Sequence, residues 1–125
     1  MRQIYLLFFS LILFNTASAK DDCELVYSTA SYALNHAKSA LKANNFEHQV
    51  YYSEKALESY EKLLKLVKGN TCTNLSEKIE NILVDAEKAA NPADWDRGRF
   101  YSKTVFNSTI ELLTELDQQL LTPKA

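Results

Sequence analysis

The chain has 125 residues, with 14 lysines and arginines against 16 aspartates and glutamates, and its formal net charge at pH 7 is −2. This slightly negative charge excludes the basic footprint of proteins that bind nucleic acid or anionic membranes. There are two glycines and two prolines, and alternation of polar and apolar residues is almost absent. The composition therefore favours an all-α protein.

The first 19 residues have the pattern of a secretory signal peptide. Arg2 precedes an apolar run over residues 4–14, and the segment ends in Ala17-Ser18-Ala19. This pattern predicts cleavage after Ala19. A membrane anchor is the alternative, but a spanning helix needs roughly 20 apolar residues, about twice the length of this run. We therefore expect a secreted or periplasmic protein whose mature part, residues 20–125, is a single helical domain without a membrane span.

Both cysteines, Cys23 and Cys72, lie in the expected mature part. An even number of cysteines in an oxidising compartment favours a disulfide, and there is no Cys-x-x-Cys motif or Cys/His cluster to indicate a metal or redox site. Closing a loop of this length stabilises a fold by about 4 kcal/mol in the chain-entropy model. We expect a Cys23–Cys72 disulfide and no metal or cofactor.

The two cysteines also begin an internal repeat. When the chain is aligned with itself at the Cys23-to-Cys72 offset of 49 residues, Tyr52-Ser53 matches Tyr101-Ser102. The other matches are Leu34 with Leu83, Ala37 with Ala86, Ala40 with Ala89, Phe46 with Trp95, Tyr51 with Phe100, Ser59 with Ser108 and Leu63-Leu64 with Leu112-Leu113. Helices rich in alanine and leucine match by chance, but the cysteine, the turn aromatic and the Tyr-Ser pair at one offset indicate a duplication.

Each half of the repeat is predicted to be an αα-hairpin, the first over residues 22–68 and the second over residues 72–121. Apolar residues recur at three- and four-residue spacing, which places them on one face of each helix. These residues are Val26, Ala30, Ala33, Ala37 and Ala40 on a helix over 22–43; Val50, Ala56, Leu57, Tyr60, Leu63, Leu64 and Val67 on 46–67; Leu75, Ile79, Ile82, Ala86 and Ala89 on 74–90; and Val105, Phe106, Thr109, Leu112, Leu113 and Leu116 on 94–121.

The ends of these helices carry capping residues. Asn45 and Asp94 are expected N-caps, Asn74 with Glu77 has capping-box spacing, and Gly69 is an expected stop. Neither hairpin covers its own apolar face, so the two stack into a four-helix bundle with internal pseudo-symmetry. A disulfide between equivalent positions would lie close to the pseudo-symmetry axis.

The small residues and the turn of the first hairpin carry a family resemblance. Ala37 and Ala40 lie in its first helix, Asn45-Phe46 at the turn and Ala56-Leu57 in its second helix. In this pattern the hairpin resembles a tetratricopeptide unit, although Gln49 stands where that family prefers alanine and the offset is longer than the 34 residues of that repeat. The resemblance implies a peptide- or protein-binding scaffold without catalysis.

Residues suited to catalysis are few. His36 and His48 are the two histidines, and His36 matches Asp85 in the repeat, so this pair could meet across the pseudo-axis. Such a pair is more often a structural hydrogen bond or a surface contact than a metal or acid–base site. The sequence has no nucleophile–base motif, glycine-rich phosphate loop or zinc-ligand spacing. We expect that the protein is not an enzyme.

Aromatic residues are the best candidates for a binding surface. Tyr51 and Tyr52 are adjacent, as are Phe100 and Tyr101, so the members of each pair point about 100° apart around a helix. With Trp95 they form the candidate interaction surface, and Tyr27, Tyr32 and Tyr60 are further aromatic candidates. The alternative is that these rings seal the turn ends of the bundle with their hydroxyls in water.

The function that this pattern favours is a non-catalytic interaction module whose partner is another protein. A second hypothesis is a carrier that holds a small apolar ligand between the hairpins. A cavity lined by the tyrosines would favour the carrier, and a tightly filled core would count against it.

Overall fold

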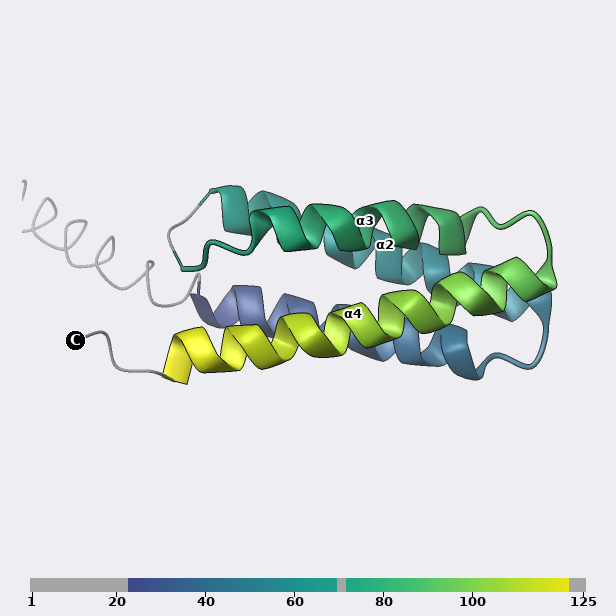
Figure 1. Ribbon diagram of the computed structural model, residues 1–125, viewed down its shortest axis with the longest axis horizontal. Coiled ribbons are helices and arrows are strands. Elements are labelled where there is room, and N and C mark those ends of the chain that lie inside the picture. The colour runs from purple at the N-terminus through teal and green to yellow at the C-terminus, as the bar shows by residue number, and fades with distance from the viewer. Residues whose placement is uncertain (1–22, 70–71, 122–125) are drawn as a thin grey trace, which may run out of the picture.

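The computed structural model describes residues 23–69 and 72–121 (Figure 1). The expected signal peptide lies outside these ranges. A first helix covers residues 23–42, followed by α2 (Phe46–Lys68), α3 (Ser76–Ala90) and α4 (Trp95–Leu121). All regular structure within the described ranges is α-helical, which confirms the predicted fold class and places the helix ends within about two residues of their expected positions. No helix in these ranges is long and apolar enough to cross a membrane.

The four helices run alternately up and down and form one bundle. In Figure 1, α3 lies beside both α2 and α4, and the first helix lies behind α4. The helices α2 and α4 therefore occupy diagonal corners. Ion pairs join neighbouring helices. Lys68 of α2 pairs with Glu80 of α3 at 3.1 Å, and Lys78 of α3 pairs with two residues of α4, Glu115 at 2.8 Å and Glu111 at 3.8 Å.

Side chains cap two of the helices as predicted. Asn45 Oδ1 accepts a hydrogen bond from the His48 backbone N–H at 2.8 Å, and Asp94 Oδ1 accepts one from the Arg97 N–H at 2.8 Å. Each of these side chains satisfies a first-turn N–H group that has no partner within the helix. At the end of α2, the Gly69 N–H donates to Lys65 O at 3.1 Å, so Gly69 is the expected stop.

The capping box predicted for the start of α3 is not formed. This helix begins at Ser76, its N-cap position is Leu75, and no side chain caps it. Asn74 instead accepts a hydrogen bond through Oδ1 from Gln119 Nε2 at 3.1 Å. The reason is tertiary, because this contact with the end of α4 occupies the side chain that the local sequence offers as a cap.

The core is the set of apolar faces that the helical spacing predicts. Most of the predicted inward residues are buried, and several leucines with Val50 and Phe106 are half-buried at the rim. The buried apolar side chains are Val26, Ala30, Ala33, Ala37, Ala40, Ala56, Tyr60, Leu63, Val67, Ile79, Ile82, Ala86, Ala89, Ala90, Val105, Leu112 and Leu116. The alanine faces of the first helix and α3 let the bulkier faces of α2 and α4 approach closely.

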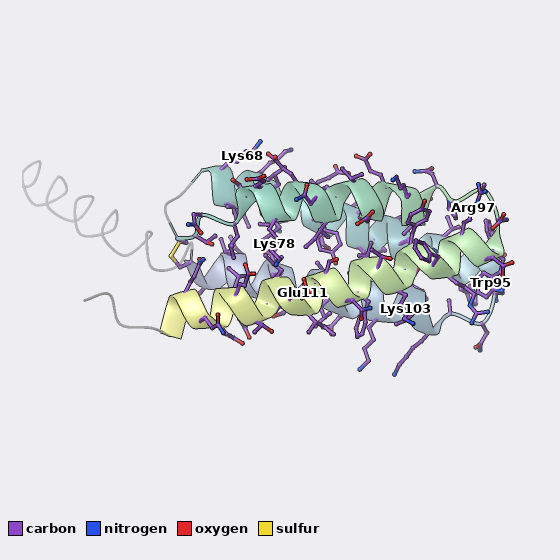
Figure 2. All side chains as sticks on the ribbon, in the orientation of Figure 1. Lys68, Lys78, Trp95, Arg97, Lys103 and Glu111 are labelled. Atoms are coloured by element: carbon purple, nitrogen blue, oxygen red, sulfur yellow. A yellow bond between two sulfur atoms is a disulfide. The ribbon has the colours of Figure 1, made fainter. Side chains whose placement is uncertain are left out.

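Equivalent residues of the two hairpins meet along the middle of the bundle. Cys23 and Cys72 form the predicted disulfide, with Cα atoms 5.4 Å apart, and Tyr60 hydrogen-bonds Thr109. At the other end, the ring centroids of Phe46 and Trp95 lie 6.4 Å apart. In a two-fold arrangement, residues meet their own equivalents where they lie on the axis. The pseudo-twofold axis therefore runs along the bundle, from the disulfide to the end where Figure 2 shows Trp95.

Candidate functional site

The predicted aromatic pairs each have one exposed ring and one half-buried ring. Tyr51 is 53% exposed and Phe100 is 65% exposed, while Tyr52 and Tyr101 are half-buried. The rings of each pair meet edge to face, with centroids 5.2 Å apart in the first hairpin and 5.3 Å apart in the second. Both hairpins thus present the same aromatic arrangement, built on the rigid helices α2 and α4.

The five candidate residues form three separate clusters. Because α2 and α4 lie on diagonal corners, the exposed rings of Tyr51 and Phe100 point to opposite sides of the bundle. Trp95 lies apart from both pairs, packed against Phe46 at the loop end. The structure therefore has two equivalent aromatic faces and one aromatic tip in place of a single patch. Tyr60 is fully buried and is part of the core.

A cation lies over a ring in each of the three clusters. Lys55 Nζ is 5.7 Å from the Tyr51 ring centroid, Lys88 Nζ is 5.6 Å from that of Tyr101, and Arg99 Cζ is 5.7 Å from that of Trp95. Cation–π contacts at exposed sites contribute about 0.5–1 kcal/mol each. A cation thus borders one ring of each cluster, while Tyr51 and Phe100 stay exposed to solvent.

A groove of about 440 Å³ lies beside Tyr52, between the first helix and the start of α2. Its lining is polar and basic and consists of Lys38, Ser39, Lys42, Ala43, Asn44, His48 and Tyr52. Within the described ranges neither Lys38 nor Lys42 has an ion pair. Sequence reasoning identified Tyr52 but missed the two lysines, because their position beside α2 depends on how the helices pack.

A second feature that the sequence analysis missed is a polar cluster on the pseudo-axis. Gln49 is fully buried, and its Nε2 lies 2.8 Å from Ser53 Oγ, 2.9 Å from Ala89 O and 2.9 Å from Ser102 Oγ. Gly98, the residue equivalent to Gln49, makes room for this side chain. A Cβ at Gly98 would overlap the Gln49 amide oxygen and lie 2.9 Å from its Cδ. The offset that aligns Gln49 with Gly98 and Ser53 with Ser102 is the sequence signal that could have found the cluster.

A small cavity of about 10 Å³ lies next to this cluster. It is lined by four pairs of equivalent residues, namely Ala37 and Ala86, Ala40 and Ala89, Ser53 and Ser102, and Ala56 and Val105. This volume is about that of one water molecule. The cavity therefore lies on the pseudo-axis, and none of its lining residues is a tyrosine.

The structure does not bring His36 and Asp85 together. His36 packs edge to face against Tyr32, with ring centroids 4.5 Å apart. Burial and the neighbouring Lys55 ammonium lower the pKa of His36. Within the described ranges no hydrogen bond or ion pair joins it to Asp85, and no group of three or more His, Cys, Asp or Glu side chains is placed to hold a metal ion.

Comparison of the chain with protein-family models, with curated proteins and with solved structures found no match. The resemblance of the first hairpin to a tetratricopeptide unit therefore stays a prediction.

Proposed function

We propose that this protein is an exported, non-catalytic interaction module that binds another protein through the aromatic faces of α2 and α4. The observation that carries the proposal is the exposure of Tyr51 and Phe100 at equivalent positions of the two hairpins. An exposed aromatic ring on a rigid helix leaves apolar surface in contact with water. Covering that surface with a partner stabilises the complex by about 25 cal/mol per Å² of apolar area buried. Aromatic side chains also lose little conformational entropy on binding, which is why they are enriched in interface hot spots.

Export is supported by the cysteines as well as by the N-terminal pattern. The Cys23–Cys72 disulfide is of the kind that persists in oxidising compartments. In such a compartment the cross-link keeps both aromatic faces on one rigid body. A rigid scaffold with preformed faces lowers the entropy cost of association.

The carrier hypothesis is the less favoured of the two. The cavity between the hairpins has a volume of about 10 Å³, whereas pockets for small ligands are typically about 300–1,000 Å³. Binding an apolar ligand there would require the alanine-lined core to open. We therefore place the binding activity on the outer faces.

The test is a crosslinking pull-down from the source cells with the double variant Tyr51→Ser/Phe100→Ser. The matched control is Tyr32→Ser, because Tyr32 is 61% exposed but its repeat equivalent is Asn81, which is not aromatic. We expect a specific partner that is captured by the wild type and by the control and is lost with the double variant. Equal capture by all three proteins, each shown to be folded by circular dichroism, would contradict the proposal.

A further inference from the structure

We propose that the groove lined by Lys38, Lys42, His48 and Tyr52 binds an acidic segment of the partner protein in an extended conformation. This inference rests on the proposed function, because it names the chemistry of the partner. The groove lies on the first hairpin next to the Tyr51–Tyr52 pair, so a partner that covers this aromatic face also reaches the groove. The lysines that line the groove indicate that the bound segment is acidic.

The charge of the groove is opposite to that of the whole chain. Lys38 and Lys42 are exposed, lie one helical turn apart and have no ion pair within the described ranges. The first turn of α2 adds the positive end of the helix dipole, which Glu47 on the same turn partly offsets. Glu47 does not line the groove. In a chain with a formal net charge of −2, this local concentration of uncompensated cations selects negatively charged ligands.

Hydrogen bonding at His48 adds a directed donor. Asn45 Oδ1 accepts the His48 backbone N–H, so the NH₂ group of Asn45 is the end that faces His48 Nδ1, at 3.4 Å. Because an amide NH₂ can only donate, this contact favours the tautomer in which Nδ1 accepts and Nε2 carries the proton. The Nε2–H is thus a donor for a carboxylate in the groove. The half-buried Tyr52 ring provides an apolar wall with a hydroxyl at its tip.

The spacing of the two lysines matches an extended peptide. Four residues along a helix separate Lys38 from Lys42 by about 6 Å of rise. In an extended chain, side chains two residues apart lie on the same side and are about 6.6 Å apart. A segment with acidic residues at alternate positions therefore places one carboxylate opposite each lysine. The groove volume of about 440 Å³ accommodates several side chains, far more than a single small anion needs.

The second hairpin offers a natural reference for this site. The residues equivalent to Lys38 and Lys42 are Glu87 and Asn91, so the pair of cations is not repeated. Tyr101, the equivalent of Tyr52, is covered by Lys88. The acidic-segment site is therefore a property of the first hairpin, whereas the aromatic faces belong to both.

The experiment is a titration of the purified protein, followed by the backbone amide NMR signals of Asn44, His48 and Tyr52. The probe is a blocked hexapeptide, Glu-Ser-Glu-Ser-Glu-Ser, and the reference probes are its Gln-Ser counterpart and inorganic phosphate. The test variant Lys38→Glu/Lys42→Glu introduces at position 38 the residue that the second hairpin has there. The control is Lys62→Glu/Lys65→Glu, which changes the net charge by the same amount. Both lysines are exposed on α2 and do not line the groove, so this variant leaves the groove unchanged.

We expect the acidic peptide to shift the groove signals, with affinity at least about tenfold lower for the groove variant and within about twofold of wild type for the control. Added salt should weaken the binding. Equal affinity for both variants, or equal affinity for the Gln-Ser peptide, would overturn the proposal. Phosphate bound as tightly as the acidic peptide would also overturn it, since the groove would then be a simple anion site. If a glutamate variant is not folded, Lys38→Gln/Lys42→Gln takes its place, with the same directions expected.

The pull-down separates this inference from the proposed function. If Lys38→Glu/Lys42→Glu retains the partner and Tyr51→Ser/Phe100→Ser loses it, the proposed groove site is overturned. The proposal of an interaction module is then still supported. Loss of the partner with both variants supports both proposals. Retention by both variants contradicts both.

Discussion

The two hairpins share one backbone plan but differ in opposite ways inside and outside the bundle. On the pseudo-axis their equivalent residues are complementary in size, because Gln49 fills the space left by Gly98 and Tyr60 reaches Thr109. On the outer face their equivalent residues differ in charge, with Lys38 and Lys42 in one hairpin and Glu87 and Asn91 in the other. Differences on the axis thus let the hairpins pack together, whereas differences on the outer face give the two hairpins surfaces of different charge.

Removal of the disulfide tests how much the axial core holds by itself. The variant Cys23→Ser/Cys72→Ser should lower the free energy of unfolding by about 4 kcal/mol, because the loop that the disulfide closes in the unfolded chain becomes free. Chemical denaturation followed by circular dichroism measures this change. A loss below about 1 kcal/mol would show that the noncovalent contacts between equivalent residues already fix the two halves.

An exchange of Gln49 and Gly98 tests the complementarity directly. Gly98→Gln places two large amides at one point of the axis, and Gln49→Gly removes a fully buried side chain with its contacts to Ser53 and Ser102. Each single variant should lose about 3 kcal/mol of stability. Because the two positions are equivalent about the axis, the double exchange should recover at least half of the summed loss in a double-mutant cycle. Additive losses would contradict the two-fold relation at this point.

Alkaline titration tests the other axial pair. Thr109 Oγ1 donates its proton to Val105 O at 2.6 Å, so the Tyr60 hydroxyl must be the donor to Thr109. Burial raises the pKa of Tyr60 far above its ordinary value of about 10. A raised folded-state pKa gives stability that is complete below pH 10 and declines above it, because the unfolded state then releases a proton that the folded state keeps.

The expected decline for Tyr60 is about 1.4 kcal/mol per pH unit above pH 10. Because the unfolded tyrosine is only half ionised at pH 10, the wild type should lose about 1.4 kcal/mol in total from this group between pH 9 and pH 11, and Tyr60→Phe should lose less over the same interval. Denaturation measured at both pH values checks this difference. Part of the loss of stability at high pH should occur in both proteins, because the hydrogen bond to Asp117 raises the pKa of Tyr27. Equal slopes for wild type and variant would contradict the role assigned to Tyr60.

Variants of the two capping residues test whether the turns of the two hairpins contribute equally to stability. Asn45→Ala and Asp94→Ala each remove a side-chain acceptor for a first-turn N–H, so each should cost about 1 kcal/mol. Thermal unfolding of both variants in the same buffer measures the loss of stability at each cap. A difference of more than about 1 kcal/mol between them would show that the turns of the two hairpins are not energetically equivalent.

The helices and the buried faces could be predicted because they depend on spacing along the chain. The disulfide could be predicted because the chain has two cysteines and no metal or redox motif that would use them. Three- and four-residue periodicity identifies Ala30 or Leu112 as inward without any knowledge of their neighbours. The cap expected at Asn74 failed for the opposite reason, since a contact with Gln119 some 45 positions away competes with the local hydrogen bond. Local signals are reliable where no distant group competes.

The parts of the candidate site that escaped prediction depend on pairs of helices. Gln49 is polar, and a pattern of polar and apolar residues places it outside, yet it is buried because a glycine and two serines surround it. The groove likewise requires Lys38 and His48 to come from different helices. The aromatic pairs were identified, but their division between two opposite faces follows from the diagonal placement of α2 and α4.

The disulfide makes the two hairpins unequal in their covalent connections, although they are related by the pseudo-twofold axis. The bond between Cys23 and Cys72 closes a covalent ring that contains the whole first hairpin, including its turn at residues 43–45. A protease that cuts this turn leaves two fragments still bonded to each other. A cut at residues 91–94, the corresponding turn of the second hairpin, releases α4 as a separate piece held by packing alone. Exposed turns are the preferred places for such cuts. The groove residues Lys38 and Tyr52 thus stay covalently linked after a cut in either turn, whereas a cut in the second turn separates Phe100 from them.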